Sequence, residues 1–575
     1  MISYTAFYFL VWCGFVNFKS KYLTSAFLLL FTSVIVKIIG AVYKIPLTAF
    51  IGAVGRGYFA AAYNLYMPLH ALTMGAFPIA LSKLVSKYNA SNNKQMIVSL
   101  KKGSLRLFSL VGLGGMIIIL ILAKPYSVFI ASSPKSIYTI LVLAPSILFS
   151  CLASAYRGYY EGFMNMVPTS VSQMIEAFFK MIFGLLFAKL SMSYMYNMYI
   201  ETGCVFGHKI SCDEEALSFI YPFTSAAAML GVSLGSAVSL IYVFIYYKIN
   251  NSERLSYSNF AVHDAQKELL SFSFPIMISC AVQSVFQFLD TASVQYSLGN
   301  VDPMILYHEY SGTDIAAGDL VTYSYGLLST ALDFKNLVPG ITMALGVCAV
   351  PAISSAFELK DKMHLENLSN SIVKYTALLS CFGGGFIALC SRDILTLFYG
   401  SSSPDIVLHC DKLVWWMSVS VFVFSLAGTA VFCVQAIGCP EKSIKPYVVS
   451  GIIRVVLNLV LIQRENLLLY GFVISGAAGY FVMWIWNMII YKRAANVKIS
   501  IFKNVIKPIT VAVISYLFTY FMVDYFNLPS STVLKLLINL SIFGAFFCIL
   551  SFMLNLLDFK EIIKYKNCKK NSSNT

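Results

Sequence analysis

Charged side chains are scarce in this sequence. Asp, Glu, Lys and Arg make up 12% of its 575 residues, about half of their share in ordinary soluble domains. Hydrophobic residues make up 58%, and the mean hydropathy is +0.75. A soluble protein of this composition could not cover its surface with polar groups. The composition therefore excludes a soluble globular domain and predicts a polytopic membrane protein.

Motifs for metal or catalytic chemistry are missing too. The thirteen cysteines form no CxxC pair and no zinc spacing, and most lie in apolar runs, where we interpret them as small hydrophobic residues. The sequence has no HExxH motif, no aspartate-rich metal motif and no histidine–carboxylate pair at a useful spacing. We therefore expect a protein that is not an enzyme and holds no metal or cofactor. For Cys204 and Cys212, in the expected outer loop 192–217, a disulfide stays open.

Long apolar runs recur along the whole chain, and they predict an all-α fold of about fourteen membrane-spanning helices. The runs lie near 22–47, 58–82, 103–123, 136–159, 168–190, 218–247, 269–297, 319–352, 370–390, 412–437, 446–463, 466–491, 505–524 and 532–557. Two of them, 218–247 and 319–352, exceed one bilayer crossing, and we expect them to bend or protrude. Residues 1–18 are apolar but lack a basic start, so we interpret them as an interfacial segment or an upstream extension.

Basic residues are distributed unevenly between the loops. The net charge of +15 lies mainly in short loops and at the ends, which indicates the positive-inside rule rather than nucleic-acid binding. The segments 83–102, 248–267 and 492–507 are rich in Lys and Arg, whereas 297–318 contains neither. This alternation predicts a multi-pass protein of the plasma membrane with both termini in the cytoplasm.

The two halves of the chain contain similar strings. LTMGAFPIALSKL resembles the later ITMALGVCAVPAISSAF, and each has a serine four residues after a proline. Pro168 precedes Glu176 by eight residues, as Pro446 precedes Arg454. Both matches have an offset close to half the chain, which suggests two similar bundles.

Three segments resemble a known family. They read KIIGAVYKIPLTAFIGAVGRGYF, GAFPIALSKLVSKYNA and YRGYYEGFMNMVPTSVSQMIEAFFK. They are similar to the stage V sporulation protein B and polysaccharide-export branch of the multidrug/oligosaccharidyl-lipid/polysaccharide exporter superfamily. The resemblance implies two pseudo-symmetric six-helix bundles around a central cavity, with two more helices at the C-terminal end.

The resemblance also implies a division of the chain and a function. We expect an apolar extension (1–21), a first bundle (22–247), a cytoplasmic linker (248–268), a second bundle (269–491), two added helices (492–557) and a basic cytoplasmic tail (558–575). The implied function is a flippase that moves undecaprenyl-linked sugars across the bacterial cytoplasmic membrane by alternating access. Lipid II, the peptidoglycan precursor, and a polysaccharide repeat unit both fit as substrate. Membrane lipids and envelope-synthesis enzymes are the expected partners.

Three basic residues early in the chain are candidates for binding the sugar diphosphate. Lys37 and Lys44 lie two helical turns apart, on one face of an apolar helix. A charge there would face protein or a wet cavity. Arg56 lies among glycines that would let its guanidinium approach a phosphate closely. The alternatives are that Lys44 extends to the outer interface and that Arg56 is a solvated loop residue.

Four charged residues further on are candidates for gating or coupling. Arg157 and Glu161 flank the inner end of a span, where a simple interfacial ion pair is an equal alternative. Glu176 precedes Lys180 by four residues, the favourable order for a helix ion pair. This pair either neutralises itself or responds to protons or substrate. Coupling to Na⁺ or H⁺ is a hypothesis that rests only on Glu176 and, in the second half, Asp290.

The second half offers a polar stripe and an isolated arginine. Gln283, Gln287 and Asp290 recur on one face of an otherwise apolar helix, where they could bind sugars, coordinate a cation or join helices. Arg454 has no obvious partner in the sequence, and Asn458 lies one turn beyond it. These five residues complete the predicted substrate-binding set.

Three other functions fit parts of the sequence. A cation-coupled drug exporter of the same superfamily would present carboxylates and aromatic rings to its substrate, whereas the first helix presents lysines. A membrane glycosyl- or acyltransferase would need a catalytic cluster at one membrane face. A scaffold without transport would have no need of buried charges.

The predicted orientation can be tested by cysteine labelling in a cysteine-free background. Single cysteines in 83–102 should react with a membrane-impermeant maleimide only from the inner side, because this loop is basic. Single cysteines in 297–318 should react only from the outer side. The reverse pattern would overturn the orientation.

Overall fold

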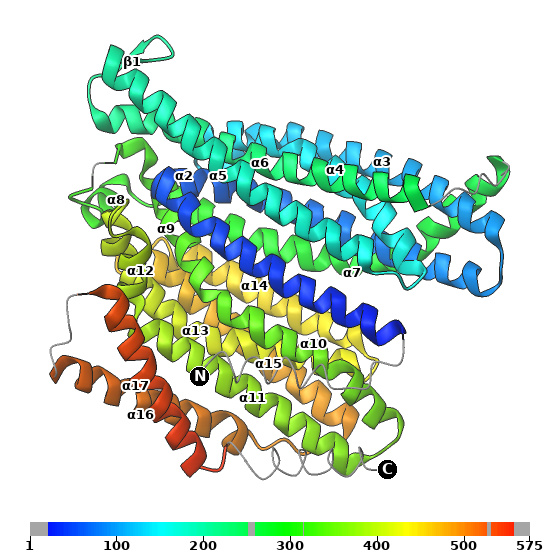
Figure 1. The fold of residues 1–575 in the computed structure, drawn as a ribbon. Helices are drawn as coiled ribbons and strands as arrows, with labels where there is room; N and C mark the ends of the chain where they lie inside the picture. The colour runs from blue at the N-terminus through cyan, green and yellow to red at the C-terminus, as the bar shows by residue number, and fades with distance from the viewer. Residues whose placement is uncertain (1–20, 251–258, 314, 526–530, 557–575) are drawn as a thin grey trace. The chain divides into compact units, whose positions relative to one another are not determined.

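The fold is almost entirely helical. The computed structural model describes residues 21–250, 259–313, 315–525 and 531–556 (Figure 1). The first elements are α2 (Lys21–Ala90), α3 (Lys94–Pro125), η1 (Tyr126–Ile130), η2 (Pro134–Ser136), α4 (Ile137–Gly162), α5 (Val167–Thr202), β1 (Cys204–Val205), β2 (His208–Lys209), α6 (Asp213–Asn250), α7 (Asn259–Gly299), α8 (Pro303–Glu309), η3 (Ala317–Asp319) and α9 (Leu320–Lys335). The others are α10 (Leu337–Glu358), α11 (Lys362–Leu389), α12 (Ser391–Tyr399), α13 (Pro404–Ala436), η4 (Pro440–Ser443), α14 (Ile444–Leu461), α15 (Leu469–Ala495), η5 (Phe502–Ile506), α16 (Lys507–Tyr525) and α17 (Thr532–Met553).

The long element α2 is a hairpin of two helices. Gly52 has φ +63° and ψ −178°, a conformation that is open almost only to glycine. The rings of Tyr43 and Phe59 lie 6.2 Å apart, although sixteen residues of straight helix would separate them by about 24 Å. The chain therefore turns back at Gly52, as Figure 1 shows in blue, and the two predicted spans 22–47 and 58–82 are confirmed.

One detail of this turn differs from the sequence-based expectation. The glycines around Arg56, namely Gly52, Gly55 and Gly57, allowed for a flexible loop at this position. Only Gly52 leaves the helical conformation, and the second helix of α2 already includes Arg56. The alternative that Arg56 is a solvated loop residue is wrong, because its side chain is only 2% exposed.

The membrane-spanning character of the chain is confirmed. Within the described residues, twelve helices are long and apolar enough to cross a membrane. Every apolar run predicted from the sequence falls on a helix, with α2 holding two of them. The long run 319–352 is divided between α9 and α10 at Asn336, which agrees with the expected bend. The extension 1–18 and the basic tail lie outside the described residues.

The chain forms two compact units. The first contains residues up to Thr330 together with Gly451–Ser475, and the second contains Ala331–Ser450 together with the residues from Gly476 onward. Helices α9, α14 and α15 each contribute to both units. The predicted division into two six-helix bundles stays a prediction, because these two units do not coincide with the repeat seen in the sequence.

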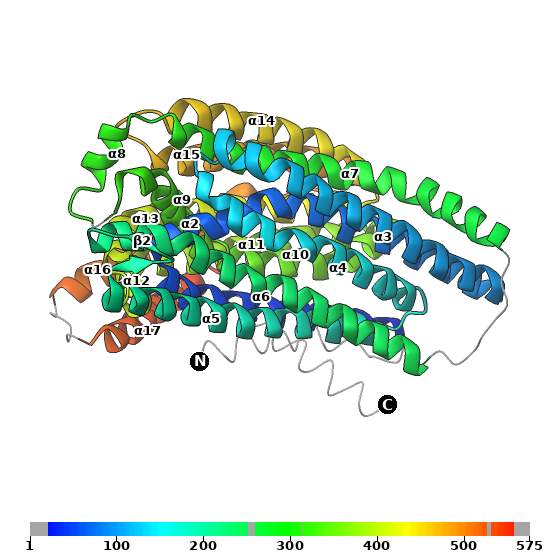
Figure 2. The same ribbon diagram turned by 90° about the horizontal axis from the view of Figure 1, so that it is seen from above.

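Helices α5 and α6 form a long antiparallel pair in the first unit. They lie side by side along most of their length (Figures 1 and 2). With 36 and 38 residues, they are about 54 and 57 Å long, well beyond the roughly 30 Å of a hydrocarbon core. A short hairpin, β1–β2, joins them where a loop 192–217 was expected. Cys204 and Cys212, in this connection, are free thiols in the structure.

Two glycines let α2 and α9 approach closely. A Cβ atom on Gly57 would lie 2.0 Å from the carbonyl oxygen of Thr322, and one on Gly326 would lie 1.8 Å from that of Ala53. Distances this short are incompatible with any side chain. The two helices can hold this spacing only with glycine at both contacts.

The Gly326 contact yields a stability prediction. Gly326→Ala should lower the melting temperature of the purified protein, because relieving the overlap with Ala53 must separate two packed helices, at about 2 kcal/mol or more. Gly114→Ala, in α3, is the matched control, since no atom lies within 4 Å of its Cβ position. Equal melting temperatures for the two variants would contradict this account of the α2–α9 contact.

Candidate functional site

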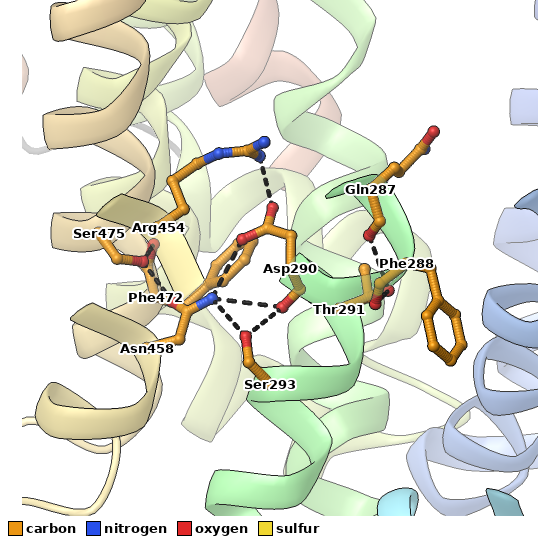
Figure 3. A network of polar contacts seen from close by, with 9 residues as sticks. All are labelled: Gln287, Phe288, Asp290, Thr291, Ser293, Arg454, Asn458, Phe472 and Ser475. Atoms are coloured by element: carbon orange, nitrogen blue, oxygen red, sulfur yellow. Dashed lines mark hydrogen bonds and ion pairs between the residues drawn. The ribbon is translucent and has the colours of Figure 1, made fainter. Parts of the chain in front are cut away.

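A buried ion pair joins α7 to α14 in the first unit (Figure 3). Arg454 donates through Nη1 to Oδ2 of Asp290 at 2.5 Å. The amide Nδ2 of Asn458 donates to Asp290 Oδ1 at 3.1 Å and to Ser293 Oγ at 3.1 Å. Ser475, from α15, donates to Oδ1 of Asn458. Both oxygens of the Asp290 carboxylate are therefore hydrogen-bonded, as a buried charge requires.

Local helix geometry brings these side chains together. Asp290 and Ser293 are three residues apart on α7, and Arg454 and Asn458 are four apart on α14, so each pair shares one helix face. Gly451 lies one turn before Arg454, and its Cβ position falls 2.4 Å from the ring of Phe286. The absence of a side chain there lets α14 come close to α7. Asp290 is thus the partner of Arg454 that the sequence did not make obvious.

A second buried ion pair joins α4 to α5. Arg157 donates from Nη2 to Oε2 of Glu176 at 2.8 Å and to Oγ of Ser239 at 2.7 Å. Its Nε donates to Oγ of Ser172 at 2.8 Å. Arg157, on α4, is thus held in place by side chains from two other helices, α5 and α6.

The pairing differs from both ion pairs expected from the sequence. Glu176 pairs with Arg157 rather than with Lys180, because Lys180 instead donates to the hydroxyl of Tyr63 on α2. Arg157 does not pair with Glu161, whose Oε1 accepts a hydrogen bond from Thr169 Oγ1 at 2.9 Å. Contacts between helices have replaced the contacts within a helix that sequence spacing suggested.

Two further cations lie near these pairs in the first unit. Lys180 Nζ lies 4.8 Å from the ring centre of Tyr63 and 5.7 Å from that of Tyr43. Arg56, on the second helix of α2, lies with its Cζ 5.3 Å from the ring centre of Phe59. The aromatic faces thus contribute to the stabilisation of both cations.

Electrostatic interactions connect the two ion pairs. Glu176 and Arg56 both act on Lys180 and on Tyr63. Arg56 also acts on Tyr325 of α9, which in turn feels the charge of Asp290. The charged side chains of both pairs and the two further cations all lie within one compact unit. We call these six side chains the polar belt: Arg56, Arg157, Glu176, Lys180, Asp290 and Arg454.

The polar belt carries an excess of positive charge. It has four basic side chains and two carboxylates, and both carboxylates are engaged by arginines. The formal charges of these six side chains therefore sum to +2. In the interior of a membrane protein such charges are costly, and a bound anion would offset that cost.

Other predicted residues lie elsewhere. Lys37 exposes its side chain, and Lys44 is half-buried. Gln283 and Gln287 are exposed, and Figure 3 shows Gln287 pointing away from Asp290. The polar stripe predicted on α7 is therefore divided, since only Asp290 joins the buried network. A predicted role for Lys37 or Lys44 stays a prediction.

Sequence reasoning missed several buried polar residues. Asn64 and Tyr325 were not singled out, although Asn64 stands in an apolar run. Gln295 continues the four-residue spacing of Gln287 and Thr291 along α7, so an extension of the stripe would have found it. His70, on the second helix of α2, lies with its ring centre 5.0 Å from that of Tyr66 and interacts electrostatically with Glu176, Arg157 and Lys180.

Sequence reasoning also missed Asp319, a buried carboxylate that contacts side chains near the starts of α4, α6 and α9. Asp319 accepts hydrogen bonds from the hydroxyl of Tyr58 at 2.7 Å and from that of Ser218. Lys135 Nζ lies 3.8 Å from Asp319 and donates to Ser218.

Within the described part of the chain, no group of three His, Cys, Asp or Glu side chains could hold a metal ion.

Comparisons with known proteins find relatives over most of the chain. Residues 22–202 match the family model described as polysaccharide biosynthesis protein. The chain is 25% identical to lipid II flippase MurJ of Bacillus subtilis (strain 168) over 496 residues, or 83% of this chain and 84% of that protein. It is 21% identical to stage V sporulation protein B of the same organism over 489 residues, or 84% and 86%. The chain is homologous to these proteins, and the resemblance seen in the sequence is confirmed.

Solved structures show the same fold. A lipid II flippase MurJ in an inward closed conformation matches with a TM-score of 0.65 at 15% identity, over 93% of this chain and 99% of that one. An inward-facing multidrug resistance MATE family transporter of the MOP superfamily matches with a TM-score of 0.60 at 14% identity, over 81% and 98%. The predicted all-α polytopic membrane fold is therefore confirmed.

The Asp290–Arg454 pair yields a second stability prediction. Arg454→Met should lower the free energy of unfolding by about 3–5 kcal/mol, because it leaves a buried carboxylate without its counter-charge. Lys535→Met is the control. It breaks the more exposed Lys535–Asp393 pair, 3.1 Å apart, and should cost about 1 kcal/mol or less.

The melting temperatures of both variants and of the wild type are compared by thermal unfolding in the same detergent. The double variant Asp290→Leu with Arg454→Met should recover much of the loss, since it removes both charges. Arg454→Met with the melting temperature of the wild type would refute a structural role for the pair.

Proposed function

We propose that this protein is a flippase that moves a lipid-linked oligosaccharide across the cytoplasmic membrane. The observation that carries the proposal is the set of basic side chains gathered in the polar belt, where Arg56 and Lys180 lie against aromatic rings and Arg157 and Arg454 pair with carboxylates. Homology to proteins named lipid II flippase and stage V sporulation protein B supports it. These relatives are not named as enzymes, and we propose a transport function without catalysis.

The chemistry of the belt suits a diphosphate. Moving such a head group out of water requires compensating charge and hydrogen bonds. Arg56 offers a planar fork of donors that matches phosphate oxygens, and Lys180 offers a mobile point charge. Both side chains are stabilised by aromatic faces, so each can gain from an incoming anion.

The finer assignment of substrate follows the relatives. We propose an undecaprenyl-linked sugar diphosphate, either lipid II or a polysaccharide repeat unit, because both combine an anionic head with a prenyl tail. We further propose that both termini are cytoplasmic and that transport proceeds by alternating access between the bundles 22–247 and 269–491. Envelope-synthesis enzymes remain proposed partners.

The energy source is part of the proposal. A negative head group moved outward gains about 2.3 kcal/mol per charge for each 100 mV of membrane potential. The two carboxylates that could have bound a coupling ion, Glu176 and Asp290, are paired with arginines at 2.8 and 2.5 Å. Na⁺ or H⁺ would have to displace a guanidinium, so we favour the membrane potential as the driving force.

A drug exporter is the second candidate, since a MATE family transporter shares the fold. A site for cationic drugs would need exposed carboxylates. The polar belt instead has four basic side chains against two carboxylates that are paired with arginines, a balance that would repel such substrates. The charge balance therefore favours an anionic cargo.

The test is binding of a prenyl diphosphate sugar to purified protein. Lys180→Gln and Arg56→Gln should each weaken binding by about tenfold or more, since each removes a charge-assisted contact of about 1.5–3 kcal/mol. Lys189→Gln is the matched control, because this exposed lysine lies on the same helix as Lys180 and should bind as the wild type does.

Two results would reject the proposal. One is wild-type affinity in both belt variants when their melting temperatures are normal. The other is failure of the wild-type protein to bind any prenyl diphosphate sugar. A preference of the wild type for cationic drugs would instead support the second candidate.

A further inference from the structure

A neutral polar cluster lies beside the polar belt in the first unit. Asn64 of α2 donates through Nδ2 to Gln295 Oε1 at 3.3 Å and to the hydroxyl of Tyr325. The hydroxyl of Tyr126, at the start of η1, donates to the same Gln295 oxygen at 2.5 Å. Four segments of the chain, α2, η1, α7 and α9, thus meet around the amides of Asn64 and Gln295. We call Asn64, Tyr126, Gln295 and Tyr325 the amide cluster.

The amide cluster has hydrogen-bonding capacity to spare. Gln295 is 2% exposed, and its Oε1 accepts both bonds described above. Among the described residues, Gln295 Nε2 donates no hydrogen bond and Asn64 Oδ1 accepts none. One unused donor and one unused acceptor, on two amides that are hydrogen-bonded to each other, are the complement of a hydroxyl or an acetamido group.

The fold positions this cluster with an irregular element. Tyr126 begins the π-helical segment η1, directly after Pro125 at the end of α3. Such segments are rare and are often found at functional sites. The ring centre of Tyr126 lies 5.9 Å from that of Phe288, which is two turns before Gln295 on α7. An aromatic surface therefore adjoins the amides, as is common where ligands combine apolar and polar faces.

The cluster is also next to the proposed phosphate-binding cations. Asn64 follows Tyr63, the partner of Lys180, and Tyr325 interacts electrostatically with Arg56. In a lipid-linked sugar the first sugar is bonded directly to the diphosphate. A diphosphate at Arg56 and Lys180 would place that sugar within reach of neutral donors and acceptors rather than of charges.

We propose that the amide cluster is a carbohydrate subsite, with Gln295 and Asn64 as specificity-determining residues for the first sugar of the cargo. The inference rests on the proposed flippase function and deepens it. A site built to hydrogen-bond a hydroxyl or amide discriminates strongly against a ligand that lacks it, because its own buried groups are then left unpaired. The protein accordingly prefers sugar-bearing prenyl diphosphates to the bare prenyl diphosphate.

The experiment compares two probes on the full-length protein in nanodiscs. One is undecaprenyl diphosphate, and the other is the same lipid carrying an N-acetylated disaccharide. The wild type should bind the sugar-bearing lipid at least tenfold more tightly. Gln295→Met, which keeps the side-chain length, should abolish most of that preference and leave the affinity for the bare lipid unchanged.

The matched control is Tyr296→Phe. Tyr296 is the next residue on α7 after Gln295, its side chain is exposed, and the variant should keep the wild-type preference. Tyr325→Phe removes one hydroxyl of the cluster and is the second variant if Gln295→Met does not fold. It should reduce the preference as well, by a smaller factor.

The outcomes separate this inference from the proposed function. Equal loss of affinity for both lipids in Gln295→Met and in Tyr325→Phe would overturn the subsite and leave the flippase standing. A wild type that binds both lipids with equal affinity would also overturn the subsite and leave the flippase standing. A wild type that binds neither lipid would reject the flippase and the subsite together.

Discussion

The cost of holding a cation away from water governs the arrangement of the first unit. Each buried guanidinium or ammonium has a specific means of stabilisation. Arg157 and Arg454 have carboxylates, whereas Lys180 and Arg56 lie against aromatic rings. A carboxylate neutralises the charge of its partner, whereas an aromatic ring stabilises a cation through its quadrupole. That difference divides the belt into a structural part, the two ion pairs, and a part suited to receive an anion.

Close helix contacts make these arrangements possible. Gly451 brings α14 to α7 next to Arg454, and Gly57 and Gly326 bring α2 to α9 next to Arg56 and Tyr325. The turn at Gly52 returns α2 alongside itself, so that Tyr43 and Tyr63 both face Lys180. Small residues at helix crossings thus determine where long polar side chains can meet.

Much of the fold could be predicted from the sequence, and much of the site could not. Apolar runs long enough for a bilayer identify helices regardless of how they pack, so even the hairpin in α2 was expected. Pairings within a helix were less reliable. The spacing of Glu176 and Lys180 suggested an ion pair, but Arg157 from another helix took that place. Arg454 looked unpaired because Asp290 lies 164 residues away along the chain. Long-range partners of this kind leave no local signal, whereas Gln295 did leave one, in the four-residue spacing after Gln287.

The central claim is that the cations of the polar belt, rather than the exposed Lys37, receive the charged head of the cargo. A structure of the protein with a lipid-linked sugar diphosphate bound would test it most directly. Our account predicts phosphate density within hydrogen-bonding distance of Arg56 and Lys180, with the Arg157–Glu176 and Arg454–Asp290 pairs intact. Phosphate density at Lys37, or at a site remote from both belt cations, would contradict it.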